Sequence, residues 1–314
     1  MRYIVRFLLL LVMVAAAGLP GFARGVLAQE ASPVASPVRA GDEDFAGLVD
    51  IGGRSLFLQC EGAGSPTVVL EAGRFASETW AAVMAGVAPT TRVCRYDRAN
   101  TGQSDPAPLP RSGEDVVADL HALLTAADVP GPYVLVGGGL GGLFTRLYAA
   151  TYPDEVAGMV LVDAVYEEVF NLQGLLNTPA DMAETLRLDF AGGDPEGIWT
   201  PESVEVTFAQ AREARLAGPF PAIPLVVLAA GTFYGGPDSP YPPASDAVWP
   251  GLSVLIQQTL ATLTPDARYE LVPDSGSQIQ VDRPDAVIAA IAEVVGAVRD
   301  PGTWGTVAGA TPAP

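Results

Sequence analysis

The stretch Tyr133-Val-Leu-Val-Gly-Gly-Gly-Leu-Gly-Gly142 decides the fold of this chain. Its first four residues are apolar or aromatic and predict a short buried strand. Residues Gly141 to Tyr152 predict a helix that ends before Pro153. The glycines between them indicate a backbone that bends sharply and is closely approached by other atoms. A strand, a glycine turn and a helix in succession are typical of an α/β sheet with its functional site at the turn.

Strand and helix signals alternate on both sides of this turn. Runs of β-branched and aromatic residues predict strands over 48–51, 54–60, 67–70, 92–96, 133–136, 160–162, 225–229 and 269–272. Apolar residues at helical spacing predict helices over 116–127, 141–152, 254–263 and 284–298. This alternation predicts one α/β domain, residues 44–300, whose mostly parallel sheet carries helices on both faces. Residues 164–220 lose the rhythm and predict a short cap inserted above the carboxyl edge of the sheet.

The glycine turn has two possible interpretations. Gly137, Gly139 and Gly142 fit the G-x-G-x-x-G pattern of a dinucleotide-binding loop, and Asp163 follows about 20 residues later, as that pattern requires. Dinucleotide loops, however, follow the first strand of their domain, and several strands precede this one. The second interpretation is a nucleophile elbow, G-x-S-x-G, with glycine in place of the central serine.

Four segments in the same order resemble the α/β-hydrolase superfamily, in its serine esterase and peptidase-like branch. Val68-Val-Leu-Glu-Ala-Gly73 is similar to the family's oxyanion strand and turn, and Tyr96-Asp-Arg-Ala-Asn-Thr-Gly-Gln-Ser-Asp105 to its Y-D-R-x-x-x-G-x-S loop. Residues 133–156 look like the elbow and its helix. Asp274-Ser-Gly-Ser277 looks like the segment that normally ends in the catalytic histidine. The resemblance covers nearly all of residues 46–298 and implies the α/β-hydrolase fold.

The departures from the family pattern imply a degenerate catalytic triad. Gly139 stands at the nucleophile position and Ser277 at the position of the general base, and Gly138 replaces a residue that is frequently histidine. Two candidates for the acid remain open: Asp238 and Asp163.

The oxyanion-type scaffold is expected to persist. The resemblance places it around Gly73, Arg74, Gly138, Gly139 and Leu140, with the backbone N–H groups of Arg74 and Leu140 directed at the pocket.

The first hypothesis for function is a noncatalytic pseudoenzyme that binds a small molecule in the former substrate pocket. Arg74, beside the two N–H groups, favours an anionic ligand. The alternative is a weak or unconventional esterase with a displaced site, in which Ser104, Ser275 or Ser277 works with a carboxylate. The only histidine, His121, lies on a helix that leads away from the pocket. A dinucleotide-binding protein is the third candidate.

Cys60 and Cys94 are the only two cysteines. The resemblance places them on antiparallel neighbouring strands, and we therefore expect a disulfide or a near contact between them.

The ends of the chain indicate export. Arg2 and Arg6 precede the apolar run Phe7–Ala17, and small residues end at Ala28, which predicts a signal peptide over residues 1–28. An uncleaved N-terminal membrane anchor is the alternative. Residues 29–43 predict a flexible Pro/Ser/Ala linker and 301–314 a disordered tail. We therefore expect a secreted or extracytoplasmic protein without stable membrane insertion after cleavage.

Composition excludes several other functions. The formal charge is −19, and all 17 basic residues are arginine, so nucleic acid and anionic membranes are disfavoured as partners. The sequence contains no cluster of cysteine and histidine, and we expect neither a metal nor a cofactor.

Overall fold

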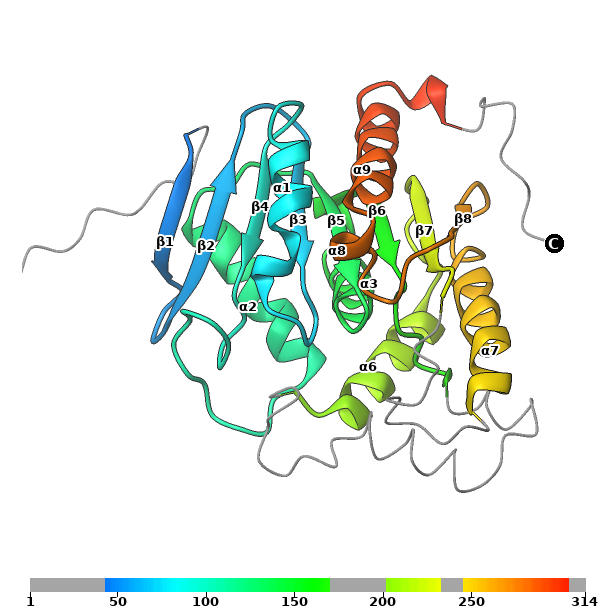
Figure 1. Cartoon of the computed structure of the whole chain (residues 1–314). Coiled ribbons are helices and arrows are strands. Elements are labelled where there is room, and N and C mark those ends of the chain that lie inside the picture. The colour runs from blue at the N-terminus through cyan, green and yellow to red at the C-terminus, as the bar shows by residue number, and fades with distance from the viewer. Residues whose placement is uncertain (1–42, 170–201, 233–244, 305–314) are drawn as a thin grey trace, which may run out of the picture. The chain divides into compact units, whose positions relative to one another are not determined.

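A computed structural model describes residues 43–169, 202–232 and 245–304 of the chain. These residues form an eight-stranded sheet in the order β1-β2-β4-β3-β5-β6-β7-β8 (Figure 1). The strands are β1 (Phe45–Asp50), β2 (Ser55–Glu61), β3 (Thr67–Glu71), β4 (Val93–Tyr96), β5 (Tyr133–Gly138), β6 (Val156–Val162), β7 (Leu225–Ala230) and β8 (Arg268–Val272). β2 pairs antiparallel with β1 and β4, and the other pairs are parallel. The predicted fold class, a mostly parallel α/β sheet, is confirmed.

Helices cover both faces of the sheet (Figure 1). On one face lie α1 (Ala81–Val87), α8 (Ile279–Asp282) and α9 (Pro284–Arg299); on the other lie α2 (Gly113–Ala126), α3 (Gly141–Thr151), α6 (Val204–Ala217) and α7 (Ser245–Leu260). Short 3-10 turns cover Ser77–Trp80, Pro153–Glu155 and Pro301–Thr303.

The side chains of each strand alternate between these two layers. In β3, Val69 joins the core under α2 and α3, while Val68 and Leu70 join the core under α1 and α9. A strand buried on both faces must be apolar on both, and this explains why β3 and β5 read as continuous hydrophobic runs.

Local sequence sets the helix boundaries. Ser112 and Asp115 form a capping box at the start of α2. The short α1 was not predicted, because none of its residues provides a side-chain cap and seven residues are too few for a clear helical period. Helix α7 begins at Ser245, earlier than the predicted 254, and it contains Pro250.

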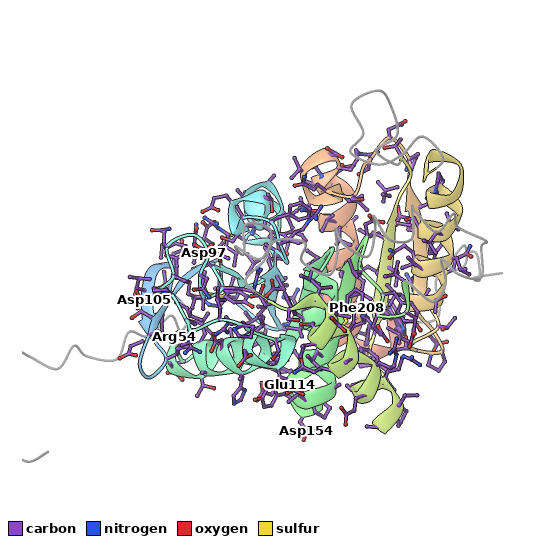
Figure 2. All side chains as sticks on the ribbon, turned by 90° about the horizontal axis from the view of Figure 1, so that it is seen from below. Arg54, Asp97, Asp105, Glu114, Asp154 and Phe208 are labelled. Atoms are coloured by element: carbon purple, nitrogen blue, oxygen red, sulfur yellow. A yellow bond between two sulfur atoms is a disulfide. The ribbon has the colours of Figure 1, made fainter. Side chains whose placement is uncertain are left out.

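The loop after β4 is held against the hairpin of β1 and β2. The Ser55 N–H donates to Asp105 at 2.7 Å, and within the loop the Gln103 N–H donates to Asp97 at 2.9 Å. Asp97 and Asp105 are labelled in Figure 2. At the other end of the domain, the Arg268 guanidinium lies 4.5 Å from the centre of the Trp304 ring. This contact extends the ordered domain to Trp304, past the expected end at residue 300.

Most of the predicted terminal segments, 1–28, 29–43 and 301–314, lie outside the described residues, as does the middle of the predicted cap. Within the described residues, no helix combines the length and apolar composition that a bilayer-spanning segment requires.

Candidate functional site

The turn between β5 and α3 has the backbone of a nucleophile elbow. Gly139 adopts a φ of 54°, its N–H donates to the Val162 carbonyl at 3.0 Å, and its own carbonyl accepts from the Val165 N–H at 2.9 Å. A Cβ at Gly137 would lie 2.5 Å from the Gly141 carbonyl oxygen, and one at Gly141 would lie 2.3 Å from the Glu71 carbonyl oxygen. Close packing therefore requires the two outer glycines of the turn.

The central position of the elbow is different. A Cβ atom at Gly139 would have Phe75 Cε2 as its nearest non-neighbouring atom, at 3.7 Å, which is an ordinary van der Waals contact. Position 139 therefore has room for a side chain, and only its positive φ disfavours one. The elbow keeps its shape and lacks its attacking atom.

Asp163 and Ser277 meet beside the elbow. Asp163 follows β6 with a φ of 42°, and its carboxyl group accepts a hydrogen bond from the Ala230 N–H at 3.3 Å. The side chains of Ser277 and Ser253 also hydrogen-bond to this carboxyl group. Of the two acid candidates, the structure brings Asp163 to position 277, while Asp238 lies outside the described residues.

The three positions that the resemblance assigns to the triad are partly exposed. Gly139, Asp163 and Ser277 are each intermediate in exposure, whereas the residues directly before and after Gly139 and Asp163 are buried. Protein encloses the Asp163 carboxyl enough that desolvation raises its pKa, although the hydrogen bonds from Ser277, Ala230 and Ser253 oppose this effect. The Asp163 carboxyl group is thus poorly hydrated, although the residue as a whole is partly exposed.

The turn after β3 packs directly on the elbow. Gly73 has a φ of 59°, and a Cβ there would lie 2.4 Å from the Gly141 nitrogen and 2.8 Å from the Gly138 carbonyl oxygen. The described part of the chain supplies no acceptor for the Leu140 N–H. This N–H lies at the start of α3, where the helix dipole also favours a negative group.

Arg74 is exposed, and its guanidinium carbon lies 5.4 Å from the centre of the Phe75 ring. Phe75 in turn approaches position 139, so Arg74 belongs to the rim of the site. At Gly138, the neighbouring side chains are Trp80 and Gln280, whose nearest atoms would lie 3.2 Å and 3.7 Å from an added Cβ.

A buried ion cluster that sequence reasoning missed supports the oxyanion turn. Arg98 pairs with Glu71 and Glu202, each at 3.2 Å, and also donates to the Gly73 carbonyl. Tyr96 donates to Glu71 from the other side. Burial raises the pKa of the Glu71 carboxyl even though the Arg98 guanidinium opposes it. Arg98 lies within the Tyr96–Asp105 motif, but nothing in the sequence links it to Glu202.

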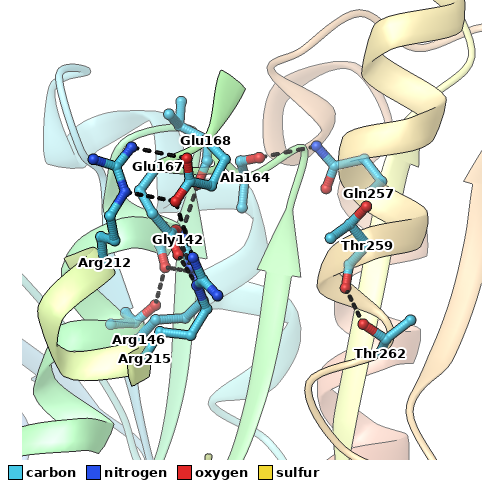
Figure 3. A network of polar contacts seen from close by, with 12 residues as sticks. Gly142, Arg146, Ala164, Glu167, Glu168, Arg212, Arg215, Gln257, Thr259 and Thr262 are labelled. Carbon is cyan, nitrogen blue, oxygen red and sulfur yellow. Dashed lines mark hydrogen bonds and ion pairs between the residues drawn. The ribbon is translucent and has the colours of Figure 1, made fainter. Parts of the chain in front are cut away.

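A second network joins the two described ends of the segment predicted as a cap (Figure 3). Arg146 of α3 donates to Glu167 at 2.7 Å, and Arg215 of α6 donates to the same carboxyl group at 2.8 Å. Arg212 forms two hydrogen bonds to Glu168, at 2.6 and 2.8 Å. Burial alone would raise the pKa of Glu167, but the neighbouring arginines outweigh it and lower that pKa. The residues directly after Asp163 are thereby joined to α3 and α6.

The hydroxyl groups of the other two candidate serines form hydrogen bonds with backbone groups. The Ser104 hydroxyl donates to the Asp97 carbonyl at 2.6 Å and accepts from the Phe57 N–H. The Ser275 hydroxyl donates to the Gly276 carbonyl at 2.9 Å. His121 stacks on Tyr152 with ring centres 4.1 Å apart and contacts Glu155, so it is a packing residue on α2. Of the three candidate serines, Ser104, Ser275 and Ser277, only Ser277 contacts the Asp163 carboxyl group.

Cys60 and Cys94 form a disulfide bond between β2 and β4, where they are directly opposite. Among the described residues, no group of three or more histidine, cysteine, aspartate or glutamate side chains is placed to hold a metal ion.

The strand order also distinguishes this turn from a dinucleotide-binding loop. Such loops follow the first strand at the reversal point of a doubly wound sheet. Here the turn follows β5, and Asp163, the residue that would have bound the ribose, instead contacts Ser277.

Comparisons with known proteins point to one family. A sequence profile of the alpha/beta hydrolase fold matches residues 66–217. The uncharacterized protein YqjL of Bacillus subtilis is 38% identical over 104 residues, which make up 33% of this chain and 41% of that protein. An uncharacterized vacuolar membrane protein of Saccharomyces cerevisiae is 37% identical over 152 residues, 45% of this chain and 24% of that protein. The matches span less than half the length of these relatives.

Solved structures show the same architecture. A thermophilic esterase from Thermogutta terrifontis in its malate-bound form has a TM-score of 0.56 at 20% identity, covering 82% of this chain and 99% of that one. An enol-lactonase from Burkholderia xenovorans has a TM-score of 0.54 at 18% identity, covering 80% of this chain and 100% of that one. At these identities the likeness establishes the fold alone.

Proposed function

This chain belongs to the α/β-hydrolase superfamily, and from that premise we propose that it is an exported pseudoenzyme that binds a small molecule in the former substrate site. One observation carries the proposal. The elbow centre is Gly139, which has no side chain, and the partner of Asp163 at the base position is Ser277, which cannot act as imidazole does. The scaffold around these positions is intact.

The two sides of the site define the ligand that we propose. The Leu140 N–H at the start of α3 favours an oxygen that carries negative charge, such as a carboxylate. Arg74 at the rim adds a positive charge on the approach to this N–H. A small anionic or carbonyl-bearing molecule is therefore the proposed occupant.

Export rests on the first 28 residues and on the disulfide. The charged start, short apolar run and small residues before position 29 are typical of a signal peptide. A disulfide such as Cys60–Cys94 forms and persists in an oxidising compartment. Mass spectrometry of the purified extracellular protein tests this directly, and a chain that retains residue 1 on a membrane would overturn it.

The test of the lost chemistry compares two proteins on short-chain p-nitrophenyl esters. The natural protein is expected to be inert, because hydrolases stripped of their triad retain only about 10³–10⁴-fold acceleration and lose roughly 10⁶-fold. The Gly139→Ser/Ser277→His double variant restores a nucleophile and a base beside Asp163 and is expected to turn over. Efficient hydrolysis by the natural protein would falsify the pseudoenzyme proposal.

The contact between Ser277 and Asp163 favours one second candidate, a weak esterase with a displaced nucleophile. In that case the carboxylate of Asp163 would accept the Ser277 proton during attack on an ester. Ser277→Ala separates the two candidates: it abolishes residual hydrolysis if Ser277 is the nucleophile and leaves it unchanged if the oxyanion scaffold alone is responsible.

A further inference from the structure

A cavity separate from the elbow lies between α3, α6 and the segment that follows α7. Its volume is about 430 Å³, which is within the range of small-molecule binding sites. Leu147 and Ala211, which line it, are buried, whereas Ala150 and Pro219, which also line it, are exposed. The cavity therefore runs from the surface into the domain, and none of the elbow residues lines it.

The lining of this cavity is apolar apart from two arginines and one threonine. Among the described residues that line it, only Arg146, Arg215 and Thr262 have polar side chains, and none is acidic. The remaining side chains are apolar and include Phe220 and Leu263. Such a lining suits a molecule that combines an apolar body with a single anionic group, because the apolar body loses little hydration on entry.

The two arginines are held in place by the protein itself. Arg146 is buried and donates to the Gly142 carbonyl at 3.2 Å and the Val165 carbonyl at 2.7 Å. Arg146 and Arg215 both donate to the Glu167 carboxyl group, at 2.7 and 2.8 Å (Figure 3). Because these contacts already order both side chains, ligand binding does not have to meet that entropic cost.

Positive charge is in excess beside the cavity. The described network contains three arginines and two glutamates: Arg146, Arg212, Arg215, Glu167 and Glu168. The Nη1 group of Arg215 donates to no acceptor within the described part of the chain. A carboxylate placed beside Arg215 would gain a charge-assisted hydrogen bond and would balance the excess charge.

We propose that this cavity is a second binding site, for a small amphipathic carboxylic acid. The apolar tail of the acid packs against the alanine and proline side chains of the lining, and its carboxylate accepts a hydrogen bond from Arg215, with the charge of Arg146 nearby. This site is distinct from the elbow, and the proposal does not depend on the function proposed for the elbow.

Octanoate is the probe, and 1-octanol, which has the same chain length without the charge, is its control. Ligand-observed NMR titrations of the natural protein at neutral pH give both affinities. We expect saturable octanoate binding with a Kd on the order of 0.1 mM and octanol binding about tenfold weaker. Equal affinities for the two ligands, or no saturable binding of octanoate, would overturn the proposal.

A pair of arginine variants tests the role of Arg215. Arg212 and Arg215 both pair with Glu168, but Arg212 is not among the residues that line the cavity. We expect Arg215→Gln to weaken octanoate binding about tenfold and to leave octanol binding unchanged, which also shows that the cavity is intact. Arg212→Gln should leave both affinities unchanged. Equal effects of the two variants on octanoate contradict the proposal.

Filling the cavity tests where octanoate binds. Ala214 of α6 lines the cavity, whereas the exposed Ala209 of the same helix does not. Ala214→Leu should weaken the binding of both ligands at least about tenfold, and Ala209→Leu should weaken neither. If Ala214→Leu does not fold, Ala150→Leu on the α3 side of the cavity makes the same test.

Octanoate binding that is as strong in the folded cavity-filling variants as in Ala209→Leu would show that octanoate binds elsewhere, and would overturn the proposal. None of these titrations measures ester hydrolysis by the natural protein or by the Gly139→Ser/Ser277→His variant. Failure of this proposal is therefore distinguishable from failure of the function proposed for the elbow.

Discussion

The side chain of Ser277 hydrogen-bonds to the carboxyl group of Asp163, two residues that are far apart in sequence and that follow different strands of the sheet. In an active member of the superfamily, this pair would be histidine and its acid. A hydroxyl group at position 277 cannot accept and return a proton near neutral pH as imidazole does. The proposed loss of the base therefore rests on this pair.

We expect Asp163→Asn to increase stability at pH 7. Desolvation raises the folded-state pKa of Asp163 above its ordinary value of 3.8, so the folded protein becomes less stable as pH rises from that value through the raised pKa. The amide removes this effect, with a gain on the order of 1 kcal/mol, the usual size of a single-residue change. Urea unfolding at several pH values measures it. A gain that is largest near ~pH 4 and absent at neutral pH would contradict the assignment.

Alanine should be tolerated far better at Gly139 than at Gly137. At Gly139 the added Cβ meets only Phe75, and the expected loss is the strain of a positive φ, about 1–3 kcal/mol. At Gly137 the Cβ would lie 2.5 Å from a backbone oxygen of Gly141, which can move only with α3. Chemical denaturation of both variants tests the order, and equal losses would show that the elbow is not packed as described.

Removal of Arg146 should be costly. Arg146→Ala leaves the buried Glu167 with only Arg215, and breaking a buried pair costs about 3–5 kcal/mol. Arg212→Ala is the control, because Arg212 is exposed and an exposed pair contributes about 0–1 kcal/mol.

The same pair should respond to pH. The arginines outweigh burial and lower the pKa of Glu167, so its contribution is fully present above the ordinary value of 4.5 and is lost as pH falls through the lowered pKa. The stability difference between the natural protein and Arg146→Ala should therefore shrink in acid. A constant difference across this range would exclude Glu167 as the partner responsible.

Replacement of both cysteines by serine should lower the free energy of unfolding by about 2–5 kcal/mol. The bond closes a loop with a sequence separation of 34 and joins adjacent strands. Titration of free thiols before and after reduction verifies the bond, and the melting temperature of the double variant measures its contribution. A free-thiol count that stays the same after reduction would show that the disulfide is absent.

The fold was predictable because its signals are local. The glycines of the elbow, the capping serine of α2 and the order of the four motifs each depend on a few neighbouring residues. The assignment of Gly139 and Ser277 to triad positions rests on the motif resemblance and stays a prediction.

Contacts between distant segments were not predictable. Glu202 reaches Arg98 across 104 residues, and no periodicity or motif connects them. The choice of Asp163 over Asp238 as the neighbour of Ser277 likewise depends on how the ends of β6 and β8 are placed in space. Such contacts are set by the three-dimensional path of the chain, which a single sequence does not specify residue by residue.

The strand order has a consequence for how the chain assembles. Both cysteines precede residue 95. Their disulfide joins the neighbouring strands β2 and β4, and β3 lies beside β4 in the sheet. From β3 onward, the strands β5, β6, β7 and β8 are added at one edge of the sheet in the order in which they follow one another in the sequence. The covalently closed first third can therefore serve as a template before the ligand site, which needs residue 277, exists. A chain that ends before residue 277 could therefore already hold the disulfide while it lacks part of the candidate site.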